Sequence, residues 1–268
     1  MADNPPLADW QRYRLDLAYD GRGLAGWQSQ VGVVTVQDLL LAALQSISPQ
    51  IKEVQGSGRT DAGVSAERQV AHFDAPPEAS LTEDQWRRAL NSRLPPSVRI
   101  WACRKVAHDF HARFSAVGKH YRYDLFDGEV LPPWLLGLAW HHRLRAGPEA
   151  LAEALALYCG THDFRAFSAN RGDGRDATRN SIRTLSRVEL ESEPDGLLHL
   201  HVSGNGFLYK MVRFLVGTAV YVAEGRCSTD EVRTLLAGVD PSQKAPYCAP
   251  PDGLRLMSVA YPDGPTLA

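Results

Sequence analysis

The sequence lacks an apolar run of about 18 residues, the length that a bilayer-spanning helix needs. It also lacks the basic start and apolar centre of a secretory signal peptide, because residues 1–10 are polar and contain proline. We therefore expect a cytoplasmic chain with no membrane partner.

Cysteine is scarce, and charge of neither sign dominates. The four cysteines, at 103, 159, 227 and 248, are far apart and form no Cys-x-x-Cys pair, which indicates free thiols in a reducing compartment and no metal site. The net charge of −2 does not by itself indicate a nucleic-acid-binding protein.

The basic residues that are present are segregated along the chain. Residues 86–123 contain nine Lys or Arg and one acid, and residues 165–187 contain six Arg and two Asp. Arginine binds phosphate bidentately, so these segments predict a phosphate-binding stripe that includes Arg87, Arg88 and Arg113. Within the second segment, residues 168–180 form a Gly- and Arg-rich loop that either contacts RNA or is a mobile surface loop.

Glycine is concentrated around one acid. Three glycines in eight residues, 56–63, give a permissive loop that carries Asp61 and leads into alternating residues at 67–73, the period of a strand. A phosphate-cradling P-loop is excluded because it needs Gly-Lys-Ser/Thr before a helix, and a dinucleotide fingerprint fails on its glycine spacing. A turn that bonds its own backbone is the simpler alternative.

Periodicity predicts the elements of the first half. Strands are expected at 13–19, 67–73 and 98–106, helices at 35–48 and 82–92, and an extended segment at 51–55. Thr35 with Asp38, and Thr82 with Gln85, have the spacing of a reciprocal capping box. This β-α-β-β-α-β order is the split arrangement of a ferredoxin-like domain.

The second half predicts a similar order with interruptions. An alternating strand begins at 121–125, helices are expected at 148–158 and 207–223, and strands at 182–190, 197–202 and 254–260. A short helix opens at Ser228, capped with Glu231.

Residues 58–64 (GRTDAGV) resemble the active-site signature of the tRNA pseudouridine synthase A (TruA) family. Five further stretches agree with that family in order and span most of the chain: 19–21 (YDG) with 26–28 (GWQ), 35–37 (TVQ), 110–115 (FHARFS), 119–123 (KHYRY) and 204–213 (GNGFLYKMVR). One departure is Ser65, where the family usually has His.

This resemblance implies an α+β pseudouridine synthase fold, with two ferredoxin-like domains that share a continuous antiparallel sheet and an active site in the cleft between them. The domains expected here are a tail at 1–10, an N-terminal domain at 11–110 with the catalytic loop, and a C-terminal domain at 111–268. The implied activity is isomerisation of uridine to pseudouridine in the anticodon stem-loop of tRNA, without a cofactor or metal, by a homodimer.

Roles of individual residues also follow from the resemblance. It implies that Asp61 is the catalytic acid, that Tyr121 stacks on the target base, and that Arg213 is the cation paired with Asp61. A buried cation on the apolar helix at 207–223 would need such a partner. The other substrate contacts that it implies are Gly58, Arg59, Thr60, Phe114, Lys119 and Met211, with Arg59 entering the RNA stack to help extrude the nucleotide.

Two alternatives stay open from the residues alone. A non-catalytic RNA-binding protein with paired ferredoxin-like domains would keep the basic segments without needing Asp61. A carboxylate-dependent hydrolase would ordinarily need a second acid or a metal cluster, and neither is apparent in the sequence.

Overall fold

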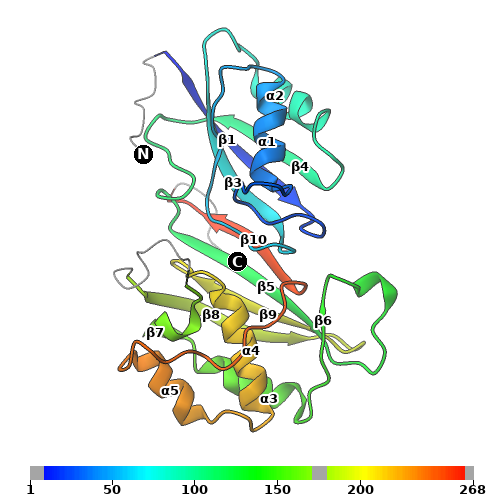
Figure 1. The fold of residues 1–268 in the computed structure, drawn as a ribbon, viewed down its shortest axis with the longest axis vertical. Coiled ribbons are helices and arrows are strands. Elements are labelled where there is room, and N and C mark those ends of the chain that lie inside the picture. Colours follow the sequence, from blue (N-terminus) through cyan, green and yellow to red (C-terminus); the bar gives the residue numbers. More distant parts are fainter. Residues whose placement is uncertain (1–8, 171–179, 263–268) are drawn as a thin grey trace. The chain divides into compact units, whose positions relative to one another are not determined.

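The computed structural model describes residues 9–170 and 180–262. Contacts within the chain group it into two compact units, the first running to Val117 and resuming at Leu256, the second comprising Gly118–Arg255. Each unit combines helices with β-strands (Figure 1), which confirms the α+β class. The domains at 11–110 and 111–268, and a sheet continuous through both, stay predictions.

The first unit has the element order of a ferredoxin-like domain. Its elements are β1 (Gln11–Tyr19), α1 (Val36–Gln45), β2 (Gln55–Gly56), β3 (Ser65–Ala75), α2 (Glu83–Asn91) and β4 (Val98–Lys105). The sheet runs β4-β1-β3 with β2 beside β3, and these pairs are antiparallel. Because β2 has only two residues, β3 has further length on that edge for β10 (Leu254–Ala260).

Alternation along β1 builds the core of this unit. Tyr13, Leu15, Leu17 and Tyr19 are all buried, while the residues between them face the other side of the sheet. The Tyr13 ring lies 5.4 Å from Phe73 and 5.8 Å from the Trp86 ring on α2. These aromatic contacts fix α2 against the sheet.

Three helix starts test the predicted caps. Thr82 with Gln85 and Ser228 with Glu231 form complete capping boxes, as predicted. Thr35 does accept from the Asp38 amide, but the Asp38 carboxylate binds the Thr35 hydroxyl at 2.6 Å instead of the Thr35 amide. The reciprocal cap predicted there is wrong, because Asp is one methylene shorter than Glu and reaches the hydroxyl first.

The second unit is built on β5 (Gly118–Phe126). It continues with the 3-10 turn η1 (Pro133–Leu135), β6 (Trp140–His141), α3 (Gly147–Ala156), β7 (Gly160–Asp163), η2 (Arg165–Phe167), β8 (Ile182–Ser192), β9 (Leu197–Gly204), α4 (Met211–Ala223) and α5 (Thr229–Ala237). The strand order is β5-β9-β8-β7, all antiparallel, with the short β6 parallel to β5. Helices α3 and α4 pack together.

The start of α4 corrects one prediction. The helix begins at Met211, not at 207, because Lys210 has φ 61°, in the left-handed region that an α-helix cannot contain. Most of the predicted loop at 168–180 lies outside the described residues. Within the described ranges, no helix is both long and apolar enough to cross a membrane.

Candidate active site

A buried glutamine supports the loop that carries Asp61. The Gln69 side chain on β3 accepts from the Ser57 hydroxyl at 2.6 Å and donates to the Gly58 carbonyl at 3.1 Å. It also donates to the Tyr19 hydroxyl at 3.3 Å, and that hydroxyl shares a 2.9 Å hydrogen bond with Thr60. Burial raises the pKa of Tyr19 to about 12, so the phenol stays protonated. The network fixes both ends of the segment that leads to Asp61.

A second segment, 21–27, packs against the same loop through its backbone. The Trp27 amide donates to the Thr60 carbonyl at 3.1 Å, and the Gly63 amide donates to the Leu24 carbonyl at 3.2 Å. A Cβ at Gly26, which has φ 86°, would lie 2.5 Å from the Thr60 carbonyl oxygen. The glycine therefore permits a close backbone approach that no other residue allows.

Ser65 takes part in this packing. Its hydroxyl accepts a hydrogen bond from the Gly21 amide at 2.9 Å. A Cβ at Gly21 would lie 2.2 Å from the Val64 carbonyl oxygen, so the two backbones are in contact here as well. Serine at position 65 thus ties the far side of the loop to the segment after β1.

Asp61 itself sits at the start of a tight turn. Its carbonyl accepts from the Val64 amide at 3.1 Å, and Gly63 within the turn has φ 82°. Asp61 is partly exposed, while Thr60 before it is buried and Arg59 is exposed. The loop therefore presents one carboxylate from a backbone that is held on both sides.

In the second unit, Tyr121 lies on β5 opposite Val202. Only 8% of the residue is exposed, and its ring lies 4.9 Å from Phe207 in an edge-to-face arrangement. Phe207 belongs to the segment before α4, so this contact joins β5 to the start of that helix. Lys119 is the second residue of the same strand and is partly exposed.

Arg213 occupies the first turn of α4. Its Nε donates to the Ala249 carbonyl at 2.7 Å, and its own carbonyl accepts from the Ala249 amide at 3.0 Å. Burial raises the pKa of the Tyr123 hydroxyl, and the nearby Arg213 charge acts in the opposite direction. Both backbone groups of Ala249 thus bind Arg213, the carbonyl at the guanidinium and the amide at the backbone carbonyl. Pairing of Arg213 with Asp61 stays a prediction.

The remaining predicted contacts differ in accessibility. Phe114 is 75% exposed, beside the His111 ring at 4.3 Å, whereas Met211 is 1% exposed. The Met211 sulfur accepts from the Leu208 amide at 3.5 Å and so caps the turn before α4. Gly58 contributes its carbonyl to the Gln69 network. Their roles as substrate contacts stay predictions.

Two polar residues of β3, Gln69 and His72, are buried although no role was predicted for them. His72 is buried, accepts from the Ala112 amide at 3.2 Å through Nδ1, and lies 4.7 Å from the His111 ring. Burial, followed by the charge of Arg12, lowers its pKa to about 4. From the sequence each is only a polar residue within the strand that follows the loop, because burial of these side chains depends on the fold.

The excess of positive charge in the basic segments is smaller in the structure than a count along the sequence indicates. Arg87 and Arg88 both pair with Asp84, at 2.6 and 2.7 Å, and Arg122 pairs with Asp124 at 2.9 Å. Both acids lie just outside the counted segment at 86–123. Phosphate binding by this stripe stays a prediction.

No group of three or more His, Cys, Asp or Glu side chains that could hold a metal ion occurs in the part of the chain that the structure describes.

Comparison with known proteins gives consistent matches. The family described as "tRNA pseudouridine synthase" matches residues 154–262. The tRNA pseudouridine synthase A of Akkermansia muciniphila is 44% identical, over 94% of this chain and 96% of that protein. That of Methylacidiphilum infernorum is 41% identical, over 93% and 95%. Among solved structures, a Cbf5-Nop10-Gar1 complex is similar only distantly, with 12% identity and a TM-score of 0.34 over 78% of this chain and 44% of that chain.

Proposed function

This chain belongs to the tRNA pseudouridine synthase A family and is an isomerase that forms pseudouridine in tRNA; we propose that its targets are uridines of the anticodon stem-loop. The target positions implied by the resemblance, about 38 to 40, would be recognised more through RNA shape and phosphates than through sequence. The observation that carries the proposal is the Asp61 loop, held by Gln69 and by the 21–27 segment.

The reaction sets the requirements for the site. The bond from uracil N1 to the ribose breaks, the base turns, and a bond from C5 to the ribose forms, with loss of the C5 proton and gain of a proton at N1. No electrons are gained or lost. A carboxylate that acts on the nucleotide as nucleophile or base meets the first requirement, and we assign this role to Asp61.

Two residues of the second unit complete the proposed chemistry. Tyr121 presents an aromatic ring that is already oriented by Phe207, so stacking on the target base costs little side-chain entropy. Its hydroxyl is the proposed relay for the C5 proton. Arg213, held at Ala249, is the proposed cation that pairs with the Asp61 carboxylate.

The remaining contacts are proposed for the RNA. Arg59 is exposed on the Asp61 loop, which supports its role in entering the stem and helping to extrude the nucleotide. Phe114 and Lys119 are proposed to contact the substrate directly. Gly58, Thr60 and Met211 are proposed to act by shaping the loop and the start of α4.

We also propose that the protein acts in the cytoplasm as a homodimer that needs no cofactor. The homodimer and the lack of a cofactor follow from the resemblance to the family. Light scattering at concentrations where the protein is active tests the assembly, and a monomeric mass there would contradict it.

The decisive experiment measures tritium release from tRNA labelled at uracil C5. Asp61→Asn keeps the size of the side chain and removes its charge, so turnover should fall to background while tRNA affinity stays within a few-fold of the parent. Glu78→Gln, which removes an exposed acid from the loop after β3 in the same unit, is the control and should keep parental turnover. Continued tritium release by Asp61→Asn would show that another residue supplies the acid.

A further inference from the structure

A basic pocket lies in the second unit, at the C-terminal end of α4. It has a volume of about 820 Å³ and is lined by His142, Arg143, Leu144, Arg145, Glu224 and Arg226. Three arginines face one glutamate, so the pocket is positively charged whether or not His142 is protonated. None of these residues belongs to the proposed reaction site.

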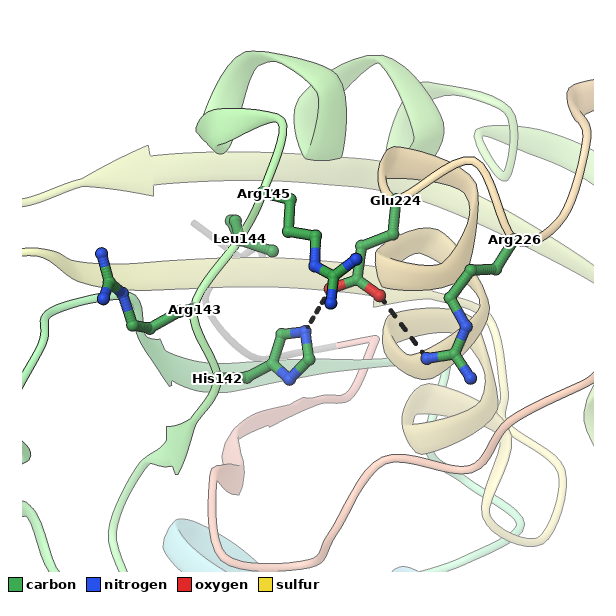
Figure 2. A pocket seen from close by; sticks show the side chains of 6 residues that line it. All are labelled: His142, Arg143, Leu144, Arg145, Glu224 and Arg226. Atoms are coloured by element: carbon green, nitrogen blue, oxygen red, sulfur yellow. Dashed lines mark hydrogen bonds and ion pairs between the residues drawn. The ribbon is translucent and has the colours of Figure 1, made fainter.

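The glutamate serves to hold two of the lining residues in place. One Glu224 oxygen lies 2.7 Å from His142 Nε2, and the other lies 3.5 Å from Arg226. Figure 2 shows both side chains pointing toward this carboxylate, whose side chain is only 8% exposed. Because its two oxygens already have partners, Glu224 organises the pocket more than it repels an anion.

Aromatic rings orient the same two residues. The Arg226 guanidinium lies 3.9 Å from the centroid of the Tyr221 ring and donates to its hydroxyl at 3.1 Å. Tyr221 stacks on Tyr247, whose other neighbour, Trp140, lies 4.6 Å from His142. These contacts form a closed ring through Glu224, which restricts the rotamers of Arg226 before any ligand binds.

The other two arginines, Arg143 and Arg145, lie on a backbone segment that is held by hydrogen bonds. The His142 amide donates to the Phe126 carbonyl at 3.0 Å and the Leu144 amide to the Asp127 carboxylate at 2.5 Å, which holds this segment in place. Arg143 and Arg145, which alternate with them, are exposed. Among residues 9–170 and 180–262, neither has an acidic partner within ion-pair distance. Their guanidinium groups therefore remain available to an external anion.

We propose that this pocket binds phosphate groups of the RNA backbone, as a contact that adds to substrate affinity without taking part in the isomerisation. Planar guanidinium groups match phosphate oxygens bidentately, and neighbouring aromatic rings suit a nucleic acid. Exposed arginines on a pocket rim fit a long polyanion better than an enclosed metabolite. The proposal rests on the proposed function, since it takes tRNA as the ligand.

The test compares the salt dependence of tRNA binding. For Arg143→Gln and Arg145→Gln, the slope of log affinity against log salt should decrease in magnitude by about 1 for each lost phosphate contact, and the loss of activity should fall on KM. Arg233→Gln removes another exposed arginine, from α5 and outside the pocket, and should bind tRNA like the parent.

Three outcomes would overturn the proposal. An unchanged slope in both pocket variants would exclude an RNA contact, and an equal change in Arg233→Gln would indicate a general effect of charge. Binding of inorganic phosphate that is lost in the pocket variants, with the tRNA slope unchanged, would identify a site for a small anion instead. Failure of the proposed function is separately visible, because the parent would then release no tritium from tRNA.

Discussion

The Tyr121 side chain has an aromatic ring and a hydroxyl, and one substitution can separate their roles. Tyr121→Phe keeps the ring against Phe207 and removes only the oxygen. If the hydroxyl relays the C5 proton, turnover should fall about 100-fold or more while tRNA affinity is retained. Single-turnover kinetics and filter binding on the same preparation separate the two effects. Parental turnover would show that Tyr121 acts through its ring alone.

From the low pKa of buried His72 we predict that the free energy of unfolding decreases in acid. Above pH 6.5 its imidazole is neutral in both the folded and the unfolded chain, so it adds no pH dependence. Between pH 6.5 and about 4 only the unfolded chain binds the proton, and the free energy of unfolding therefore falls as the pH falls. The total decrease in the free energy of unfolding that His72 causes, complete below pH 4, is about 3 kcal/mol.

Urea denaturation of the parent and of His72→Asn, at pH 7 and pH 4.5, checks this prediction. Asn keeps an acceptor for the Ala112 amide but does not titrate. The variant should lose less stability than the parent between the two pH values, since carboxylates shared by both proteins cancel in the comparison. Equal losses would contradict the low pKa of His72.

Among individual residues, the sequence predicted Asp61 but not the hydrogen bonds of Gln69 that hold its loop. Asp61 could be proposed as the acid because a Gly-rich loop and the family signature surround it. Gln69 could not, because a polar residue in a strand usually faces solvent, and only the fold places its amide between Ser57, Gly58 and Tyr19. A charge count along the sequence likewise could not show that one acid, Asp84, pairs with both Arg87 and Arg88.

Among the elements, α4 starts with a strained residue. Lys210 has φ 61°, which costs a residue with a Cβ roughly 1 kcal/mol. Lys210→Gly should therefore raise the free energy of unfolding by up to about 1 kcal/mol, whereas Lys210→Val should lower it by 1 kcal/mol or more, since β-branched residues avoid this region. Thermal unfolding of both variants provides the measurement. Equal effects would mean that loss of the lysine side chain, and not φ, decides stability.

The elements also show where sequence patterns suffice. The last strand, Leu254–Ala260, and the capped helices α2 and α5 agree with the predicted ranges to within a few residues, because local periodicity and caps define them. The start of α4 was predicted four residues early, since Phe207 and Leu208 continue the apolar pattern of the helix. The φ angle of Lys210 makes the helix start at Met211, and apolar periodicity does not encode that dihedral.

At the scale of the whole molecule, the first unit combines the chain up to Val117 with residues from Leu256 onward. Tyr261 packs 5.2 Å from Phe110, lies beneath the Arg14 guanidinium at 4.6 Å, and donates to the Ala112 carbonyl. Val117 and Ala260 are joined by a backbone hydrogen bond of 2.9 Å. Residues that carry Asp61 therefore depend on residues near the end of the chain.

A fragment of residues 1–117 should accordingly fold poorly. It lacks β10 and Tyr261, so β3 loses a strand neighbour and the cluster of Val70 and Ala112 loses its cover. We expect a broad thermal transition and poorly dispersed amide resonances, both improved when residues 254–262 are fused to the fragment. A fully cooperative 1–117 fragment would instead support an independent N-terminal domain.

Because β10 is encoded late in the sequence, the first unit cannot be completed until most of the chain has been synthesised. The residues from Val117 to Leu256 must be translated before the first unit receives its last strand, which at ordinary ribosomal speeds takes roughly 7 to 28 seconds. Throughout that interval the nascent chain already contains the complete Asp61 loop but not the strand that finishes its sheet. Chains that stop before β10 would thus carry every residue of the Asp61 loop and still lack the strand that completes its sheet.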